Sequence, residues 1–226
     1  MSDVRVVPAG DAAWLIELDD RLDPGVSARA IAIGRAIGAS TLPGLRDVVS
    51  GYRTVTVYVD PLRAEPTDLG ARLARLATEA AAEPAEGADI IDVPTHYGGE
   101  HGPDLGEVAA FAGCSEQEVV ERHCQRTYRV YLVGFVPGFP YMGTVDPRIA
   151  MPRRESPRLR VPAGSVGIAG EQTGIYPVET PGGWRLIGRT PLVLFDATRE
   201  PPCLFEPSAR VRFTPIRADE LERRRR

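Results

Sequence analysis

Residues 134–190 open with GFVPGFPYMG (134–143) and close with PGGWRLIGRT (181–190). This stretch contains 10 of the 23 glycines of the chain, together with 8 prolines. Such a composition is typical of disorder, but large apolar side chains such as Phe139 and Trp184 stand between the turns and can fill a core. Glycine permits a positive φ and proline fixes φ, so the stretch predicts tightly ordered loops. Loops ordered in this way often hold a ligand.

Residues 1–88 have the pattern of a small α+β domain. Pro24 follows Asp23, which is typical of a helix start, and Val55, Val57 and Val59 alternate with polar residues as in a half-buried strand. The expected elements are two strands within 4–18, a helix from Pro24 to Gly38 or Gly44, a hairpin over 45–60 that turns near 51–53, and a helix over 67–82. This order favours an antiparallel sheet covered by helices on one side. The acidic segment 83–89 is the expected linker.

Residues 89–226 are expected to form a second domain dominated by strands. A strand begins at Ile90, one helix opens near Pro103, and a second helix begins at Ser115, where Glu118 completes a capping box. From Tyr128 onward, short strands alternate with glycine and proline turns. Regular short strands of this kind predict a β-barrel or a closed sandwich.

Charge and hydropathy exclude several classes of function. A net charge of −4 gives no overall attraction to nucleic acid or to an anionic membrane. We find neither an apolar run long enough to cross a bilayer nor the pattern of a signal peptide at the N-terminus. The expected location is the cytoplasm. Cys114, Cys124 and Cys203 lack paired spacing, so free thiols are favoured over a disulfide or a zinc site.

The chain has no lysine, because every one of its 27 basic residues is arginine. It therefore cannot form a Schiff base, carry biotin on a lysine, or supply the lysine of a phosphate-binding loop. Seven arginines gather within the Gly/Pro-rich stretch: Arg148, Arg153, Arg154, Arg158, Arg160, Arg185 and Arg189. The planar guanidinium suits bidentate binding of a carboxylate or a phosphate. The alternative is a solvated loop that Glu155 partly neutralises.

Polar and aromatic residues next to the tight turns are candidates for a small-molecule site. Gln172, Thr173 and Tyr176 occur with Trp184 near such turns, although Trp184 as ordinary core is equally compatible with the sequence. Ser165 is not in a nucleophile elbow and no histidine follows position 123. We therefore expect Ser165 to be a hydrogen-bond donor to substrate or a turn serine, and not a nucleophile.

The three histidines are weak candidates for chemistry. His96 and His101 lie near Glu100 and Asp104, which are metal-ligating residue types, but the spacing matches no standard metal site, so no metal is expected. The glycines of this loop could instead present backbone N–H groups to an anion. His123 comes late in a predicted helix, where a capping or packing role is favoured over that of a general base.

Several runs together resemble the family of the 5-oxoprolinase B subunit, which is also called allophanate hydrolase subunit 1. The matching residues are YGGEHGPDL (97–105), His123, Tyr128, GFVPGFPYMG (134–143), PRRESPRLRVPAGSVGIAG (152–170), QTGIYP (172–177) and PGGWRLIGRTP (181–191). The resemblance implies a ferredoxin-like N-terminal domain, 1–88, and a cyclophilin-like β-barrel, 89–226. His96 departs from the small or apolar residue expected there, which speaks against a shared catalytic role.

The resemblance also implies a function. Members act with a paralogous C subunit and with an A subunit in the ATP-dependent opening of 5-oxoproline to glutamate. ATP is then expected at the complex and not on this chain alone, which would be inactive by itself. An activated lactam would place negative charge near Arg153, Arg158 and Arg189, while Gln172, Thr173 and Tyr176 would orient the ring and Ser165 would donate a hydrogen bond. The aromatic residues expected in the site loop or at the partner are Phe135, Phe139, Tyr141 and Trp184.

Two alternatives follow from the same resemblance. Related modules form the carboxyltransferase part of biotin-dependent urea carboxylases, and that role would require biotin from another chain. A further relative inhibits a sporulation histidine kinase, which would make this chain an interaction protein. The sequence motifs mark a scaffold that all three functions share, and which residues are catalytic stays open.

Overall fold

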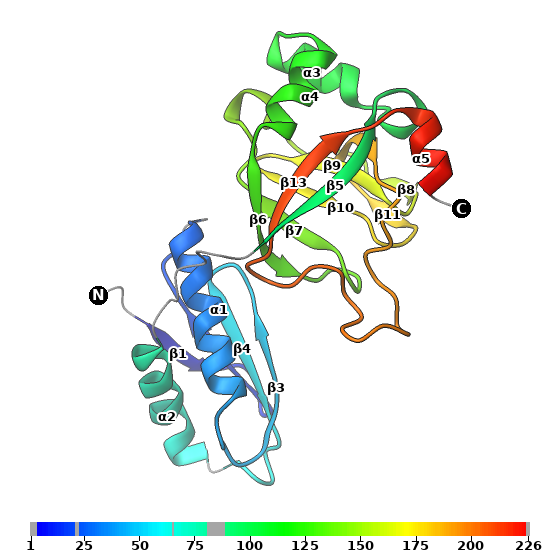
Figure 1. Cartoon of the computed structure of the whole chain (residues 1–226). Helices are drawn as coiled ribbons and strands as arrows, with labels where there is room; N and C mark the ends of the chain where they lie inside the picture. The colour runs from blue at the N-terminus through cyan, green and yellow to red at the C-terminus, as the bar shows by residue number, and fades with distance from the viewer. Residues whose placement is uncertain (1–3, 21–22, 65, 81–88, 225–226) are drawn as a thin grey trace. The chain divides into compact units, whose positions relative to one another are not determined.

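The computed structural model describes residues 4–20, 23–64, 66–80 and 89–224 and divides the chain into two compact units, 1–87 and 88–226 (Figure 1). The sequence predicted a division between residues 88 and 89. The predicted linker, 83–89, lies outside the described residues except for Asp89. Each unit has its own hydrophobic core.

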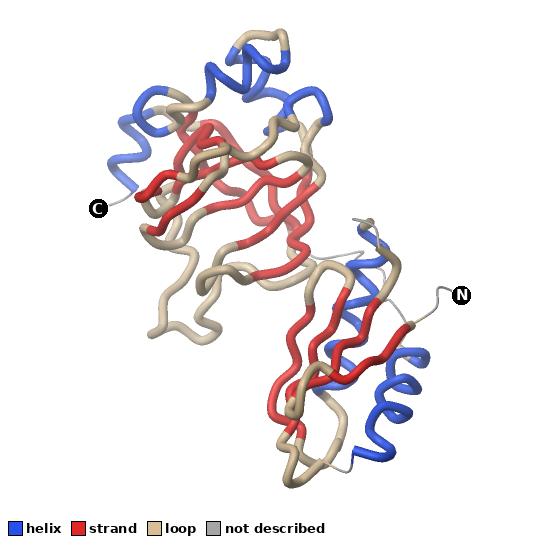
Figure 2. Tube along the Cα trace, turned by 180° about the vertical axis from the view of Figure 1, so that it is seen from behind, coloured by secondary structure: helices blue, strands red, loops and turns tan. Residues whose placement is uncertain are grey.

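The first unit is a four-stranded antiparallel sheet with both helices packed on one face (Figure 2). Its elements are β1 (Arg5–Pro8), β2 (Ala13–Glu17), α1 (Pro24–Gly38), β3 (Leu45–Ser50), β4 (Thr54–Val59) and α2 (Pro66–Glu79). The Asp23 carboxylate accepts hydrogen bonds from the backbone N–H groups of Gly25 and Val26 and so caps α1. The alternating valines of β4 are all buried, which confirms the predicted half-buried strand.

The α+β class of this unit is confirmed, but the ferredoxin-like topology is not. The sheet order is β1-β2-β4-β3, and the elements follow one another as β-β-α-β-β-α. A ferredoxin-like domain runs β-α-β-β-α-β. Here the edge strand β1 leads directly into β2, and no strand follows α2 among the described residues of this unit.

The second unit is a closed seven-stranded barrel, which confirms the predicted β-barrel. The strands in order around the barrel are β10 (Gln172–Ile175), β7 (Pro140–Gly143), β6 (Thr127–Val133), β13 (Arg210–Pro215), β5 (Ile90–Tyr97), β12 (Arg185–Arg189) and β9 (Ser165–Ala169). Neighbouring strands are antiparallel except for β5 and β13, which run parallel along six paired residues. The likeness to cyclophilin in particular stays a prediction.

Shorter elements surround the barrel. They are η1 (Gly99–His101), α3 (Leu105–Ala112), α4 (Glu116–Cys124), η2 (Pro147–Ile149), the two-stranded pair of β8 (Arg158–Val161) with β11 (Thr180–Gly182), and α5 (Ala218–Arg224). The predicted capping box is present, because the Ser115 side chain accepts from the Glu118 N–H while the Glu118 carboxylate accepts from the Ser115 N–H. Fully buried side chains such as Tyr128, Val130 and Ile187 fill the barrel core.

Candidate functional site

A groove of about 370 Å³ lies on the barrel unit, where the Gly/Pro-rich loops meet. Its lining residues are Phe135, Phe139, Tyr141, Arg153, Pro157, Tyr176, Thr180, Pro181, Gly182, Gly183 and Trp184. Six of these are site residues predicted from the sequence: Phe135, Phe139, Tyr141, Arg153, Tyr176 and Trp184. The loops therefore meet in one concave place, lined by aromatic side chains and one arginine.

Two glycines allow the aromatic residues to pack directly onto the barrel backbone. Gly167 of β9 and Gly174 of β10 are paired in register. A Cβ atom on Gly174 would lie 2.9 Å from Cζ of Phe139, and one on Gly167 would lie 3.1 Å from Cβ of Trp184. Any larger residue at Gly174 would push Phe139 outward, so the glycine sets the depth of the groove.

The aromatic rings form one contact cluster centred on Phe139, which is 1% exposed. The Phe139 ring centroid lies 4.7 Å from that of Tyr141, 5.1 Å from that of Tyr176 and 5.4 Å from that of Trp184. These separations are within the range of favourable tilted and edge-to-face pairs. The cluster is rigid at its base because Tyr176 is also buried and its hydroxyl is hydrogen-bonded with the Trp184 backbone.

Phe135 is both exposed and strained. Its side chain is 62% exposed, and its φ of 68° lies in the left-handed region that a bulky residue rarely adopts. Its ring still meets that of Phe139 edge to face, with centroids 5.8 Å apart. A large apolar side chain held in a strained conformation at a groove rim indicates a functional constraint on that position.

Most of the clustered arginines are tied to acidic side chains. The Asp104 carboxylate is 1% exposed and accepts two hydrogen bonds from Arg158, at 2.8 and 2.6 Å, and one from Arg154 at 3.2 Å. It also accepts the backbone N–H of Leu186 at 2.7 Å, which joins residues 152–158, the arginine loop, to β12. This carboxylate raises the pKa of Arg158. Neutralisation of Arg154, Arg158 and Arg185 therefore comes from Asp104 and Glu107, whereas the alternative of a solvated loop had given this role to Glu155.

Arg153 differs from these neighbours. Within the ranges that the structure describes, no carboxylate forms an ion pair with it, and its side chain is exposed. Its guanidinium lies at the groove, with Nη2 3.4 Å from the position that a Cβ on Gly183 would take. Burial raises the pKa of Tyr141, and the charge of Arg153 acts in the opposite direction, which places that charge near the phenol. Arg153 thus brings an uncompensated positive charge to an aromatic groove.

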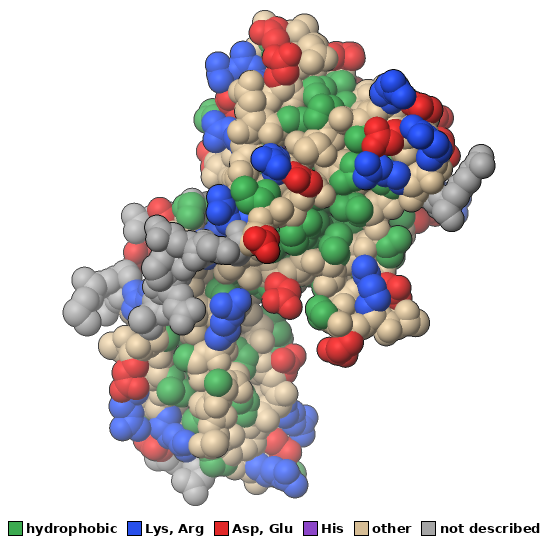
Figure 3. Space-filling model, viewed as in Figure 1, with side chains coloured by type: hydrophobic (Ala, Val, Ile, Leu, Met, Phe, Trp, Pro, Cys, Tyr) green, Lys and Arg blue, Asp and Glu red, His purple; other side chains and the backbone are tan. Residues whose placement is uncertain are grey.

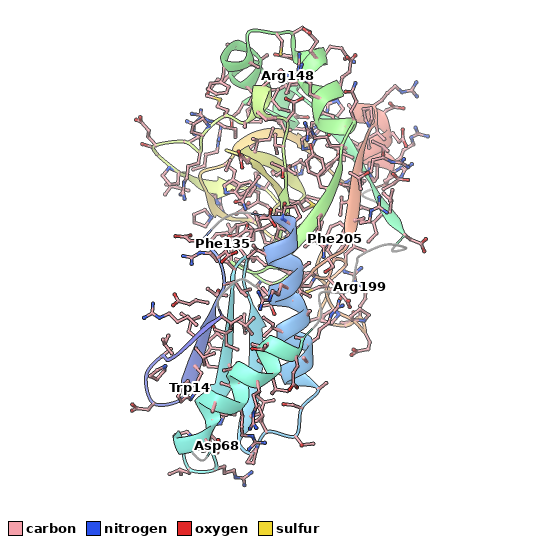
Figure 4. All side chains as sticks on the ribbon, turned by 90° about the vertical axis from the view of Figure 1, so that its left-hand side faces the viewer. Trp14, Asp68, Phe135, Arg148, Arg199 and Phe205 are labelled. Carbon is pink, nitrogen blue, oxygen red and sulfur yellow. The ribbon has the colours of Figure 1, made fainter. Side chains whose placement is uncertain are left out.

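Other arginines lie elsewhere. Figure 4 shows Phe135 and Arg148 at opposite ends of the barrel unit, and Arg148 is paired there with Asp146 at 2.7 Å. Arg148 also lowers the pKa of Asp146. Over the face drawn in Figure 3, acidic and basic side chains are interspersed, with apolar side chains between them. The seven arginines of the sequence cluster therefore do not form one anion site.

Thr173 lies inside the barrel, in a buried hydrogen-bonded chain. His123 Nε2 is 2.9 Å from Thr173 Oγ1, which donates to the Gly167 carbonyl at 3.1 Å, and His123 Nδ1 is 2.8 Å from the Tyr97 hydroxyl. Because the threonine proton goes to the carbonyl, we assign the ring proton to Nε2. Burial lowers the pKa of His123 to about 3, so this ring is a neutral packing residue, as predicted. Thr173 is fully buried, which does not favour direct contact with a ligand in the groove.

The remaining predicted residues also lie outside the groove lining. Ser165 is 2% exposed at the start of β9, and Arg189 donates to the Ala163 carbonyl at 2.8 Å. Gln172 is half-buried at the start of β10. Arg158 is committed to Asp104. Roles for these four side chains in substrate binding stay predictions.

The histidine loop has its own geometry. Nδ1 of His96 and Nδ1 of His101 are 3.0 Å apart, so one ring donates to the other, and burial lowers the pKa of His101. Across the described residues, no group of three or more His, Cys, Asp or Glu side chains is arranged to hold a metal ion. Nor does any described helix have the length and apolarity needed to cross a membrane.

Sequence reasoning missed two features of this site. It named Asp104 only as a weak metal-ligand candidate, although its carboxylate organises the arginine loop, and it did not name Thr180 in the groove wall. Burial of Asp104 had no local signal, because its partner Arg158 lies 54 residues along the chain.

Comparison with known proteins identifies the family of this chain. The chain belongs to the family of carboxyltransferase domains, subdomains C and D, whose model matches residues 4–205. Among individual relatives, the B subunit of 5-oxoprolinase from Bacillus subtilis (strain 168) is 39% identical over 226 residues, covering 94% of this chain and 92% of the relative. The B subunit of 5-oxoprolinase from Escherichia coli O157:H7 is 41% identical over 215 residues, covering 95% and 97%.

A solved structure has a similar fold. The crystal structure of TTHA0988 superposes with a TM-score of 0.80 at 37% identity, covering 91% of this chain. This chain spans only 40% of the length of TTHA0988. A more distant relation is the putative urea carboxylase of Emericella nidulans, which is 35% identical over 105 residues, covering 43% of this chain and 8% of that protein.

Proposed function

We propose that this chain is the B subunit of an ATP-dependent 5-oxoprolinase and acts with an A and a C subunit to convert 5-oxoproline to glutamate. The observation that carries the proposal is the near full-length identity of 39% and 41% with two relatives named as B subunits of 5-oxoprolinase. The aromatic groove supports it, because it is concave, mostly apolar and supplied with few polar groups, as small-molecule sites are.

The composition of the chain supports a division of labour in this complex. Cleavage of the lactam coupled to ATP needs a phosphate-binding site, and the chain has no lysine to serve one in a Walker-type loop. We therefore place ATP on the assembled complex, with this chain contributing the binding and positioning of the organic substrate. By itself the chain would then be inactive.

Reconstitution tests the proposal directly. The three subunits are purified separately, and 5-oxoproline-dependent release of ADP and of glutamate is measured for the full mixture and with each of the three left out in turn. We expect turnover only in the full mixture. Folding of each component is checked by circular dichroism, and absence of turnover with three folded components would refute the role.

Carboxyl transfer to a urea-like amide is the second candidate. The observation favouring it is the family description itself, together with the partial match to a urea carboxylase. Because the chain has no lysine, biotin would have to be carried by another protein. Transfer of labelled carboxylate from carboxybiotin to urea, in place of ATP-dependent glutamate formation, would distinguish this candidate from the first.

Inhibition of a histidine kinase stays a prediction from the sequence resemblance. Its test is co-purification: kinase binding by this chain without the C subunit would favour it. The groove offers no specific observation for this role.

A further inference from the structure

We propose that the groove is a carboxylate-binding subsite that this chain forms by itself, in which Arg153 anchors the carboxylate of a small cyclic acid and the aromatic walls contact its ring. The proposal rests on the proposed 5-oxoprolinase role for the identity of the acid, 5-oxoproline. The chemistry of recognition rests on the groove alone.

The groove carries a single positive charge. Among the eleven residues that line the groove, Arg153 is the one ionised at neutral pH, and no lining residue is acidic. The neighbouring cations are already used, since Arg154 and Arg158 both bind the buried Asp104 carboxylate. A ligand carboxylate would therefore meet a guanidinium that can donate two parallel hydrogen bonds and that no protein carboxylate of the described ranges competes for.

The shape of the groove suits a small ring. The walls are flat rings from Tyr141 and Trp184, whose centroids are 5.8 Å apart, beside the buried ring of Phe139. A volume of about 370 Å³ is near the lower end of the range of ligand sites, which suits a small compact molecule. The strained, exposed ring of Phe135 extends this apolar wall at the rim. Thr180 adds a hydroxyl that can pair with a ring amide.

The backbone that carries Arg153 is preorganised for binding. The backbone is held on both sides of Arg153, because the Pro152 carbonyl accepts a hydrogen bond from Arg185 Nε at 3.2 Å and the Arg154 N–H donates to the Gly183 carbonyl at 2.7 Å. Pro152 and Pro157 restrict the loop further. Arg153 is thus presented on an ordered loop, so that only its own side chain must be immobilised on binding.

A direct binding experiment on the full chain tests the subsite without the other components of the complex. The chain has two tryptophans, Trp14 in the first unit and Trp184 in the groove, so a Trp14→Phe background makes fluorescence a reporter of the groove alone. The probes are 5-oxoproline, cyclopentanecarboxylate, which lacks the lactam, and 2-pyrrolidinone, which lacks the carboxylate. Isothermal titration calorimetry on the unmodified chain measures the same three compounds.

We expect saturable binding of both acids, and binding of 2-pyrrolidinone at least about tenfold weaker. Arg153→Gln should weaken 5-oxoproline binding by about tenfold or more and leave 2-pyrrolidinone binding unchanged. The matched control is Arg160→Gln, because Arg160 is an exposed arginine of the neighbouring strand β8 that is paired with Glu179 at 3.0 Å and does not line the groove. Circular dichroism verifies that each variant is folded.

The proposal is overturned if calorimetry detects no binding of either acid up to about 10 mM, or if Arg153→Gln and Arg160→Gln bind 5-oxoproline equally well. Failure of the subsite and failure of the proposed function are separable. If a reconstituted complex that contains Arg153→Gln turns over 5-oxoproline normally, the proposed function stands and the proposed subsite is wrong. If the chain binds the acid selectively but its complex does not act on 5-oxoproline, the subsite stands and the proposed function is wrong.

Discussion

Replacement of Asp104 by asparagine tests whether one buried carboxylate holds the arginine loop on the barrel. The substitution keeps the size of the side chain and leaves no cavity. It replaces one acceptor oxygen by an NH2 group that must face a donor, either the Arg158 guanidinium or the Leu186 N–H. It also removes the charge that compensates two arginines.

The expected loss of folding stability follows from the burial of the Asp104 carboxylate. Breaking a buried ion pair by removing one partner costs about 3–5 kcal/mol. Arg158 and Arg154 keep 25% and 29% of their side-chain surface exposed, so water can partly solvate both charges, and Arg154 keeps a second ion pair with Glu107 at 3.9 Å. We therefore expect a loss near the lower end, about 3 kcal/mol. With an unfolding entropy of about 2.1 cal/mol/K per residue for a unit spanning residues 88–226, this lowers Tm by roughly 10 °C.

The assay is urea unfolding followed by tryptophan fluorescence in two backgrounds. Trp14→Phe leaves Trp184 to report on the barrel unit, and Trp184→Phe leaves Trp14 to report on the first unit. We expect Asp104→Asn to shift the Trp184 transition and not the Trp14 transition. Asp92→Asn is the control, because Asp92 forms an ion pair with Arg212 in which both side chains are 49% exposed, and exposed pairs contribute little. Equal shifts for Asp104→Asn and Asp92→Asn would refute the reasoning.

Three further perturbations have defined outcomes. Gly174→Ala should cost about 1–3 kcal/mol in urea unfolding, because its Cβ would lie 2.9 Å from the Phe139 ring, and a cost below that of an exposed alanine substitution would contradict this packing. Phe135→Gly should change the free energy of unfolding by no more than about 1 kcal/mol, because relief of the positive φ offsets the lost ring contact. Calorimetry should show weaker binding of 5-oxoproline to this variant. A large loss of stability with unchanged affinity would make Phe135 a core residue. Burial lowers the pKa of His123 to about 3, so below about pH 6.5 the unfolded chain binds a proton that the folded chain does not, and stability falls as pH falls. Between about pH 7 and pH 5 this group should remove about 2 kcal/mol, a dependence that His123→Gln should lack, and NMR titration of the His123 ring above about pH 5 would contradict it.

Local signals in the sequence were sufficient for the elements of the first unit. Asp23 caps a helix because its side chain reaches N–H groups two and three residues away, and the strand at residues 54–59 reveals its buried face by alternation alone. Neither signal depends on distant parts of the chain. The element order β-β-α-β-β-α was predicted from these signals, whereas the ferredoxin-like topology, which places a helix after its first strand, came from the family resemblance and does not match it. The order of strands within the sheet, β1-β2-β4-β3, was not predictable in the same way, because it depends on the pairing of β2 with the distant strand β4.

The candidate site was predictable only where its residues share one pattern. The aromatic residues of the Gly/Pro-rich stretch meet because glycines let them approach the barrel, as Gly174 does for Phe139. Thr173 belongs to the same stretch, but its side chain points to the opposite side of β10, where it meets His123 from 50 residues away. Alternation along a strand separates these two faces, and the register that decides between them is set by distant pairing.

The parallel pairing of β5 with β13 has a consequence for synthesis of the protein. The Arg212 side chain meets Asp92 across 120 residues of sequence, and these two strands are neighbours in the closed barrel. A nascent chain therefore holds β5 and β6 with unpaired edges until residue 215 has emerged from the ribosomal exit tunnel. Until then, the barrel is an open sheet, and its unpaired strand edges can pair with another chain and so promote aggregation.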